Sequence, residues 1–169
     1  MSTPSTAREI VPASVNARVL DEGYGPGAWH GADLKAALAD VTPDLAFWRV
    51  APGRHNIAEI ALHHAYCIRA VRAQISGTPQ EPFVLDGEDW FVLPDQRVLP
   101  WREIQATLEA QHSGLTTLIA DIDAGRVHGP MTDGERFGLV LGITCHAVYH
   151  AGQVQLLKVL KTQNVEHRR

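Results

Sequence analysis

The stretch NIAEIALHHAYCIRAVRAQISG, residues 56–77, decides the fold class because it carries the signals of one long amphipathic helix. Asn56 is a favoured N-cap residue, Glu59 stands at the capping-box position, and Gly77 suits the position after the last turn. Apolar side chains recur between them on one helical face, which holds Ile57, Ile60, Ala61, His64, Ile68, Val71 and Ile75. The spacing predicts a helix with one buried side.

Helical segments flank this stretch on both sides. Residues 8–20 form a weak helical stretch and residues 32–40 a short helix, and the glycines and proline of EGYGPGAWHG, residues 22–31, indicate a loop between them. Pro100 suits the start of a further helix, because a missing N–H costs nothing in the first turn. Helical spacing then continues to about Asp123.

A last, long helix is predicted after a second capping box, Thr132 and Glu135. Its apolar stripe runs through Leu139, Ile143, His146, His150, Val154 and Leu157. Residues 77–100 contain four prolines and form a long crossover, and no segment alternates well enough to predict a strand. We therefore predict an all-α fold, a four-helix bundle with a long crossover between the second and third helices. It is expected to be a single domain over residues 1–169 with its core at about 30–162.

Composition excludes several classes of protein. The chain of 169 residues is 45% hydrophobic and 20% charged, which is typical of a globular domain, and its net charge of −4 offers no basic surface for nucleic acid. No apolar run approaches the roughly 18 residues that a membrane span needs. We expect a cytoplasmic protein with neither nucleic acid nor a membrane as its partner, in which Cys67 and Cys145 are reduced thiols.

Two histidines interrupt the apolar stripe of the last helix. His146 and His150 are four residues apart, so their side chains lie on one face and can hold one ion, although two ordinary core or surface histidines would show the same spacing. Buried imidazoles need partners, and a metal site needs a third ligand from another helix. The donor is His63 or His64, with Cys67 as a supplement. Amphipathicity favours His64, because this residue lies near the centre of the apolar stripe.

Three stretches resemble the DinB/YfiT-like family of metal-dependent four-helix-bundle proteins. They are GPGAWHG (25–31), PGRHNIAEIALHH (52–64) and HAVYHAGQVQLLK (146–158). In that family, one histidine of the second helix joins the pair of the last helix on a divalent ion. Alignment of the helix opening HNIAEI with the family pattern places this third ligand at His63. The resemblance therefore implies the ligand set His63, His146 and His150, with His64 as the rival.

Other side chains are candidates for supporting roles. Tyr149 and Gln153 flank the histidine pair and can orient a ligand or touch a substrate. Glu59 precedes His63 by one turn and is a candidate general base, but its capping role is the simpler interpretation. His30 either points toward the site or caps and packs the chain locally. The histidines without a partner by spacing, His112, His128 and His167, are expected to be exposed.

The motif also narrows the chemistry. HAVYH lacks the glutamate of the H-E-x-x-H zinc peptidases, and the chain lacks the inward glutamates of di-iron bundles. The resemblance implies a thiol S-transferase that uses a low-molecular-weight thiol, such as bacillithiol or mycothiol, on a small-molecule substrate. A metal-dependent hydrolase and a non-catalytic, stress-related metal-binding protein are the alternatives. Zinc or nickel is the favoured ion and iron an alternative, and a homodimer is common in the family.

Overall fold

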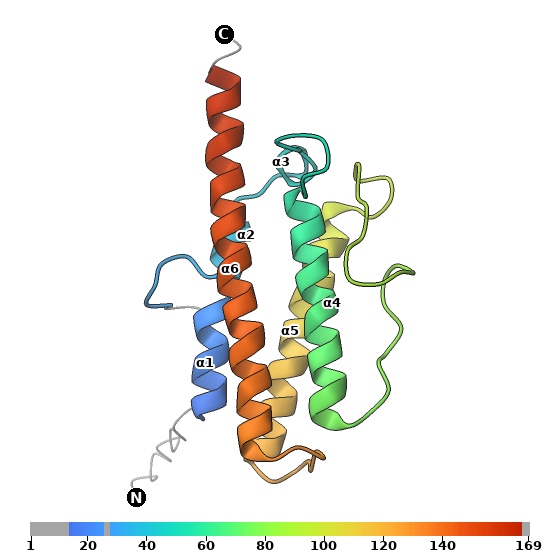
Figure 1. Ribbon diagram of the computed structural model, residues 1–169, viewed down its shortest axis with the longest axis vertical. Helices are drawn as coiled ribbons and strands as arrows, with labels where there is room; N and C mark the ends of the chain where they lie inside the picture. Colours follow the sequence, from blue (N-terminus) through green and yellow to red (C-terminus); the bar gives the residue numbers. More distant parts are fainter. Residues whose placement is uncertain (1–13, 26–27, 167–169) are drawn as a thin grey trace, which may run out of the picture.

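The computed structural model describes residues 14–25 and 28–166, and every regular element in these ranges is a helix (Figure 1). The helices are α1 (Val15–Tyr24), α2 (Leu34–Leu38), α3 (Pro43–Ala46), α4 (Ile57–Ser76), α5 (Trp101–Asp123) and α6 (Asp133–Glu166). The predicted all-α fold is confirmed. Among the described residues, no helix has both the length and the apolar character that a membrane crossing requires.

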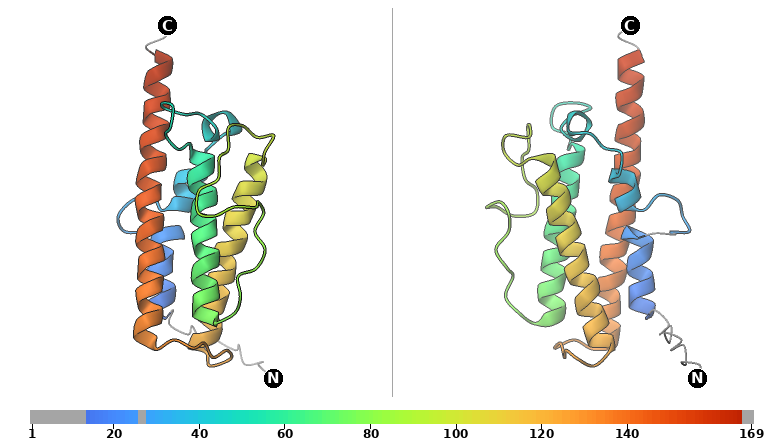
Figure 2. Two further views of the ribbon diagram at one scale, coloured as in Figure 1. Left: turned by 45° about the vertical axis from the view of Figure 1, so that its right-hand side comes forward. Right: turned by 180° about the vertical axis from the view of Figure 1, so that it is seen from behind.

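The four long helices form the bundle. α6 packs against α1 and α4, and α5 packs against the same two helices from the other side, so the four helices close a ring (Figures 1 and 2). The short α2 lies against α6 and α1. The C-terminal part of α6 extends beyond the ends of the other helices (Figure 2).

The long crossover follows from the direction of the helices. α4 and α5 are neighbours that run in the same direction, so the chain must return along the whole length of α4 before α5 begins (Figure 1). Residues 77–100 make this return on the outside of α4 (Figure 2). The predicted four-helix bundle, with a long crossover between its second and third helices, is therefore confirmed.

The ends of α4 are fixed by the residues that the sequence indicated. The Asn56 side-chain oxygen accepts a hydrogen bond from the Glu59 N–H at 2.9 Å, which caps the first turn. Gly77 has a φ of +72°, in the left-handed region that ends many helices, and a Cβ there would lie 2.9 Å from the ring of Pro130. α6 begins with the expected capping box, in which Thr132 N–H donates to the Glu135 carboxylate at 2.8 Å.

The first helix differs from its predicted position. α1 starts after Ser14, which accepts a hydrogen bond from Ala17 N–H, and continues through Tyr24 into the predicted loop. Leu20 and Tyr24 are both buried in the core, and this packing keeps the last turn helical. The core thus includes residues that precede position 30, while residues 8–13 of the predicted segment lie outside the described residues.

Candidate metal centre

Four histidines meet between α4 and α6. His63 and His64 come from α4, and His146 and His150 come from α6. Nε2 of His146 lies 3.1 Å from Nε2 of His63 and 2.9 Å from Nε2 of His150. Nε2 of His146, from α6, therefore lies within hydrogen-bond distance of the Nε2 atoms of both His63 and His150.

The other ring nitrogen of each of these three histidines has a partner. Nδ1 of His63 lies 3.0 Å from the backbone oxygen of Asp89 and 3.0 Å from its carboxylate. Nδ1 of His150 donates to the Gln153 side-chain oxygen at 2.7 Å. Nδ1 of His146 lies 2.9 Å from Nδ1 of His64. The oxygen partners of His63 and His150 fix the proton on Nδ1 and leave Nε2 with a free lone pair, as metal-binding histidines require, whereas the partner of His146 is a ring nitrogen that can donate or accept.

The spacing of the Nε2 atoms suits a small divalent ion. Two nitrogen ligands at the zinc–nitrogen distance of about 2.0–2.1 Å in a tetrahedron lie roughly 3.3 Å apart. The separations of 3.1 and 2.9 Å are close to that value. An ion bound between either pair of rings would need only a small outward movement of those two nitrogens.

Cys67 offers a further ligand atom. Its Sγ lies 3.8 Å from Nε2 of His63, one helical turn away. Among the residues that the structure describes, the metal-ligand group that forms within 4.8 Å consists of His63, Cys67 and His146. Burial, helped by the charge of Asp89, raises the pKa of the Cys67 thiol to about 11, so the thiol is protonated at neutral pH without an ion.

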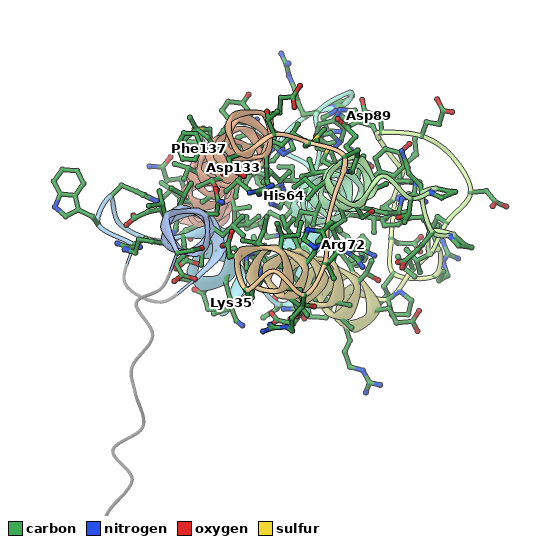
Figure 3. The ribbon with its side chains drawn as sticks, turned by 90° about the horizontal axis from the view of Figure 1, so that it is seen from below. Lys35, His64, Arg72, Asp89, Asp133 and Phe137 are labelled. Atoms are coloured by element: carbon green, nitrogen blue, oxygen red, sulfur yellow. The ribbon has the colours of Figure 1, made fainter. Side chains whose placement is uncertain are left out.

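His64, the rival ligand, has a different position. Its side chain lies at the centre of the bundle (Figure 3) and is 1% exposed. Burial lowers its pKa well below the usual value, and the neighbouring His146 and His150 lower it further, so the ring is neutral. Since Nδ1 of His64 faces Nδ1 of His146, this residue orients His146 from the side opposite the Nε2 cluster.

The crossover closes one side of the cluster. Trp90 lies between two histidines, stacked on His63 at a ring distance of 3.9 Å and on His55 at 3.7 Å. Asp89 has a φ of +59°, a backbone conformation that non-glycine residues seldom adopt, and both its backbone and its carboxylate face His63. Sequence reasoning missed both residues. The only sequence signal for these two residues was the group of aromatic and acidic side chains around them in the long crossover.

Burial and mutual repulsion keep the cluster in its ligand form. Burial lowers the pKa of His146 to about 4, and the charges that His150 and His63 would carry lower it further. The pKa of His150 is lowered by burial as well, against the opposing effect of its bond to Gln153. His146 and His150 are therefore neutral at pH 7, which is the form that binds metal ions.

Two of the supporting candidates lie at the site and two do not. Gln153 bridges the cluster to the exposed Tyr149, whose hydroxyl accepts from the Gln153 amide at 3.1 Å. Glu59 is fully engaged, because its carboxylate accepts hydrogen bonds from Arg49 and from Leu93 N–H. His30 is exposed and bonds the backbone oxygen of Glu22 at 2.7 Å, away from the cluster.

The histidines that have no partner by sequence spacing differ in their exposure. His128 is exposed, as expected. The prediction for His112 is wrong, because its ring packs on Tyr24 of α1 at 4.3 Å and is half-buried. His167 lies outside the described residues.

These features define a class: an all-helical bundle with a candidate site for a divalent metal ion between two antiparallel helices. The family model of the DinB superfamily matches residues 28–154, which is most of the chain. The protein belongs to the DinB superfamily. No curated protein and no solved structure matches the sequence.

Proposed function

We propose that the protein is a metal-dependent transferase that joins a low-molecular-weight thiol to a small electrophilic substrate. The proposed ligands are His63, His146 and His150, on zinc or nickel, with iron as the alternative. The observation that supports the proposal is the close approach of His146 Nε2 to the Nε2 atoms of His63 and His150, with a partner at the opposite nitrogen of each ring. An ion held by three neutral ligands keeps its full charge and lowers the pKa of a thiol or water bound at the open position.

Several side chains of this chain support that chemistry. Asp89 and Gln153 hold the proton on Nδ1 of His63 and His150, so that Nε2 remains available. Trp90 covers the ring of His63 and excludes water from that side. His146 is half-buried whereas His63 and His150 are buried, so a substrate would approach beside His146.

The engaged state of Glu59 favours transfer of a thiol over hydrolysis. A hydrolase gains from a carboxylate that accepts a proton from the attacking water. The Glu59 carboxylate is 3% exposed and bonded to Arg49, so it is not available for this role. Thiol transfer needs no such base, because coordination itself favours the thiolate.

Cys67 supports a second candidate, a metal-binding protein without turnover. Ligands at zinc–sulfur and zinc–nitrogen distances of about 2.3 and 2.0 Å lie roughly 3.6 Å apart in a tetrahedron. The 3.8 Å between Cys67 Sγ and His63 Nε2 is near this value, so Cys67 could occupy the fourth position and close the site.

Metal analysis and a transfer assay distinguish these candidates. Zinc- or nickel-loaded protein is mixed with 1-chloro-2,4-dinitrobenzene and with glutathione, bacillithiol or mycothiol in turn. We expect thiol-dependent turnover that His150→Ala abolishes and that the exposed control His128→Ala retains. Equal rates in both variants would exclude the proposed site.

The Cys67→Ser variant separates an open site from a closed one. If Cys67 is the fourth ligand, this substitution lowers the metal affinity and exposes a position for a thiol. If the fourth position is open, the Cys67→Ser substitution leaves the metal affinity nearly unchanged. Two results together would favour the non-catalytic candidate. The protein would bind metal stoichiometrically without turnover for any thiol, and its metal affinity would depend on Cys67.

A further inference from the structure

A cavity lies on the side of the bundle away from the histidine cluster. It has a volume of about 640 Å³ and lies among α1, α2 and α5. Lys35, at its rim, and Asp89, at the metal centre, lie on opposite sides of the bundle with His64 between them (Figure 3). No member of the histidine cluster lines this cavity, so it is a separate site.

Several polar groups of the cavity lining have no partner within the protein. In the part of the chain that the structure describes, the Asp21 carboxylate makes no hydrogen bond or ion pair. Nε2 of His112 and the hydroxyl of Thr116, one turn apart on α5, are buried and unpaired among the described residues. Buried polar groups are nearly always paired in native proteins, so two such atoms beside a half-buried carboxylate at one cavity indicate a place for a polar ligand.

The charged residues of the cavity lining indicate which charge the ligand carries. Asp21 and Asp33 contribute two carboxylates, and Asp33 uses one oxygen to accept from Ala36 N–H at 3.0 Å. Lys35 is the single lysine or arginine of the described lining, and its ammonium is already 3.0 Å from the Glu109 carboxylate. Burial lowers the pKa of His112, so this ring adds no charge at neutral pH. The lining is therefore acidic and favours a cation.

The size and walls of the cavity favour an organic cation over a metal ion. The carboxylates of Asp21 and Asp33 and the ring of His112 do not gather within 4.8 Å as a ligand group, in contrast to the cluster at His63. Ala36 and Ala39 provide apolar wall, and a volume of this order suits a small organic molecule. Ser113 and Thr117 present exposed hydroxyls at the same cavity.

We propose that this cavity binds a small amphipathic amine, with its ammonium group at Asp21 and Asp33 and its hydrocarbon part against Ala36 and Ala39. The hydroxyls of Ser113 and Thr117 would accept or donate hydrogen bonds to polar substituents of the same ligand. The site does not depend on the reaction proposed for the metal centre, because the two share no residue.

A set of three isosteric probes tests the proposed charge preference. The ¹⁵N-labelled full chain is titrated at pH 7 with cyclohexylmethylamine, cyclohexylmethanol and cyclohexanecarboxylate, and amide shifts give the dissociation constants. We expect the amine to bind at least about tenfold more tightly than the other two, because a charged hydrogen bond is lost in each. The shifts should centre on residues 21, 33, 113 and 117.

A matched pair of variants tests the role of Asp21. Asp21→Asn should weaken binding of the amine about tenfold, whereas Asp123→Asn, an exposed position with the same change of charge, should leave it unchanged. The Asp21→Asn side chain has the same shape and breaks no bond within the described protein, so folding is retained. Equal affinity for the amine and the alcohol, equal effects of the two variants, or shifts confined to α4 and α6 would each overturn the proposal.

Discussion

The histidine cluster and the cavity at Asp21 lie on two sides of one core and differ in how their polar groups are satisfied. In the cluster, every Nδ1 has a partner, and Nε2 of His146 lies close to Nε2 of both His63 and His150. At the cavity, Asp21, His112 and Thr116 have unpaired polar atoms among the described residues. The difference teaches that a preorganised ion site and an open ligand site show opposite patterns of hydrogen bonding. Five substitutions or conditions can break or sharpen this contrast.

Loss of a proposed ligand should have the largest effect. An ion at 1,000 times its dissociation constant stabilises the fold by about 4 kcal/mol, which is roughly 10 °C in melting temperature for a domain of this size. We expect His63→Ala to remove this metal-dependent increase. The measurement is a thermal melt with zinc and with a chelator, and the exposed His128→Ala serves as the control.

His64→Ala separates the two neighbouring histidines. Because His64 holds Nδ1 of His146, its loss should weaken metal binding about 10- to 100-fold without abolishing it. If His64→Ala removes the ion completely and His63→Ala does not, the assignment of the third ligand is reversed.

Acid should destabilise the metal-free protein through the cluster. The pKa of His146 is about 4 in the fold and near 6.5 in the unfolded chain, so between these values the unfolded state binds more protons. The free energy of unfolding should therefore fall by about 2 kcal/mol as the pH drops from 6.5 to 4. Urea unfolding across this range measures the effect. His146→Gln should flatten the profile, and an unchanged slope in that variant would place the effect elsewhere.

The orienting carboxylate should have a smaller effect. Asp89→Asn retains an acceptor for Nδ1 of His63 but removes the negative charge, so we expect about a tenfold loss of metal affinity. Competition with a chromophoric chelator measures it. Asp86→Asn, an exposed change in the same crossover, should show no loss.

The smallest effect is expected for a substitution at the cavity, and it should raise stability where the other changes lower stability or metal affinity. His112→Phe keeps the ring contact with Tyr24 and removes a buried nitrogen that has no partner in the described structure. Stability should stay unchanged or rise by up to about 1 kcal/mol. A clear loss of stability would mean that Nε2 of His112 has a favourable partner, such as a bound water.

Local signals explain which parts of the fold were predictable. The limits of α4 follow from Asn56 and Gly77, which act through neighbouring backbone groups. The C-terminal end of α1 was misplaced because its last turn is stabilised by the burial of Tyr24, a tertiary contact that a glycine-rich sequence conceals. His112 was misplaced for the same reason, since its burial depends on Tyr24 from another helix.

The candidate site was predictable only in part. The spacing of His146 and His150 is local to one helix, and the third ligand at His63 stays a prediction until the variants are analysed for metal. The sequence marks Asp89 and Trp90 only as part of an aromatic and acidic cluster in a loop, and it cannot place them at His63, because the course of the crossover depends on distant bonds. Asn56 donates to the Leu93 backbone oxygen at 2.7 Å, and Glu59 accepts from Leu93 N–H at 2.8 Å. These bonds anchor the crossover at one end and carry Asp89 to His63.

The stacking of Trp90 between His55 and His63 also gives the protein an internal optical reporter. An indole in face-to-face contact with an imidazole is sensitive to the charge and electronic state of that ring. We therefore expect the emission of Trp90 to change when an ion binds His63, and again when acid releases it. Subtracting the spectrum of Trp90→Phe isolates this signal from the three other tryptophans, among them Trp29, which is 92% exposed. Occupancy of the metal centre could then be followed in real time without a label.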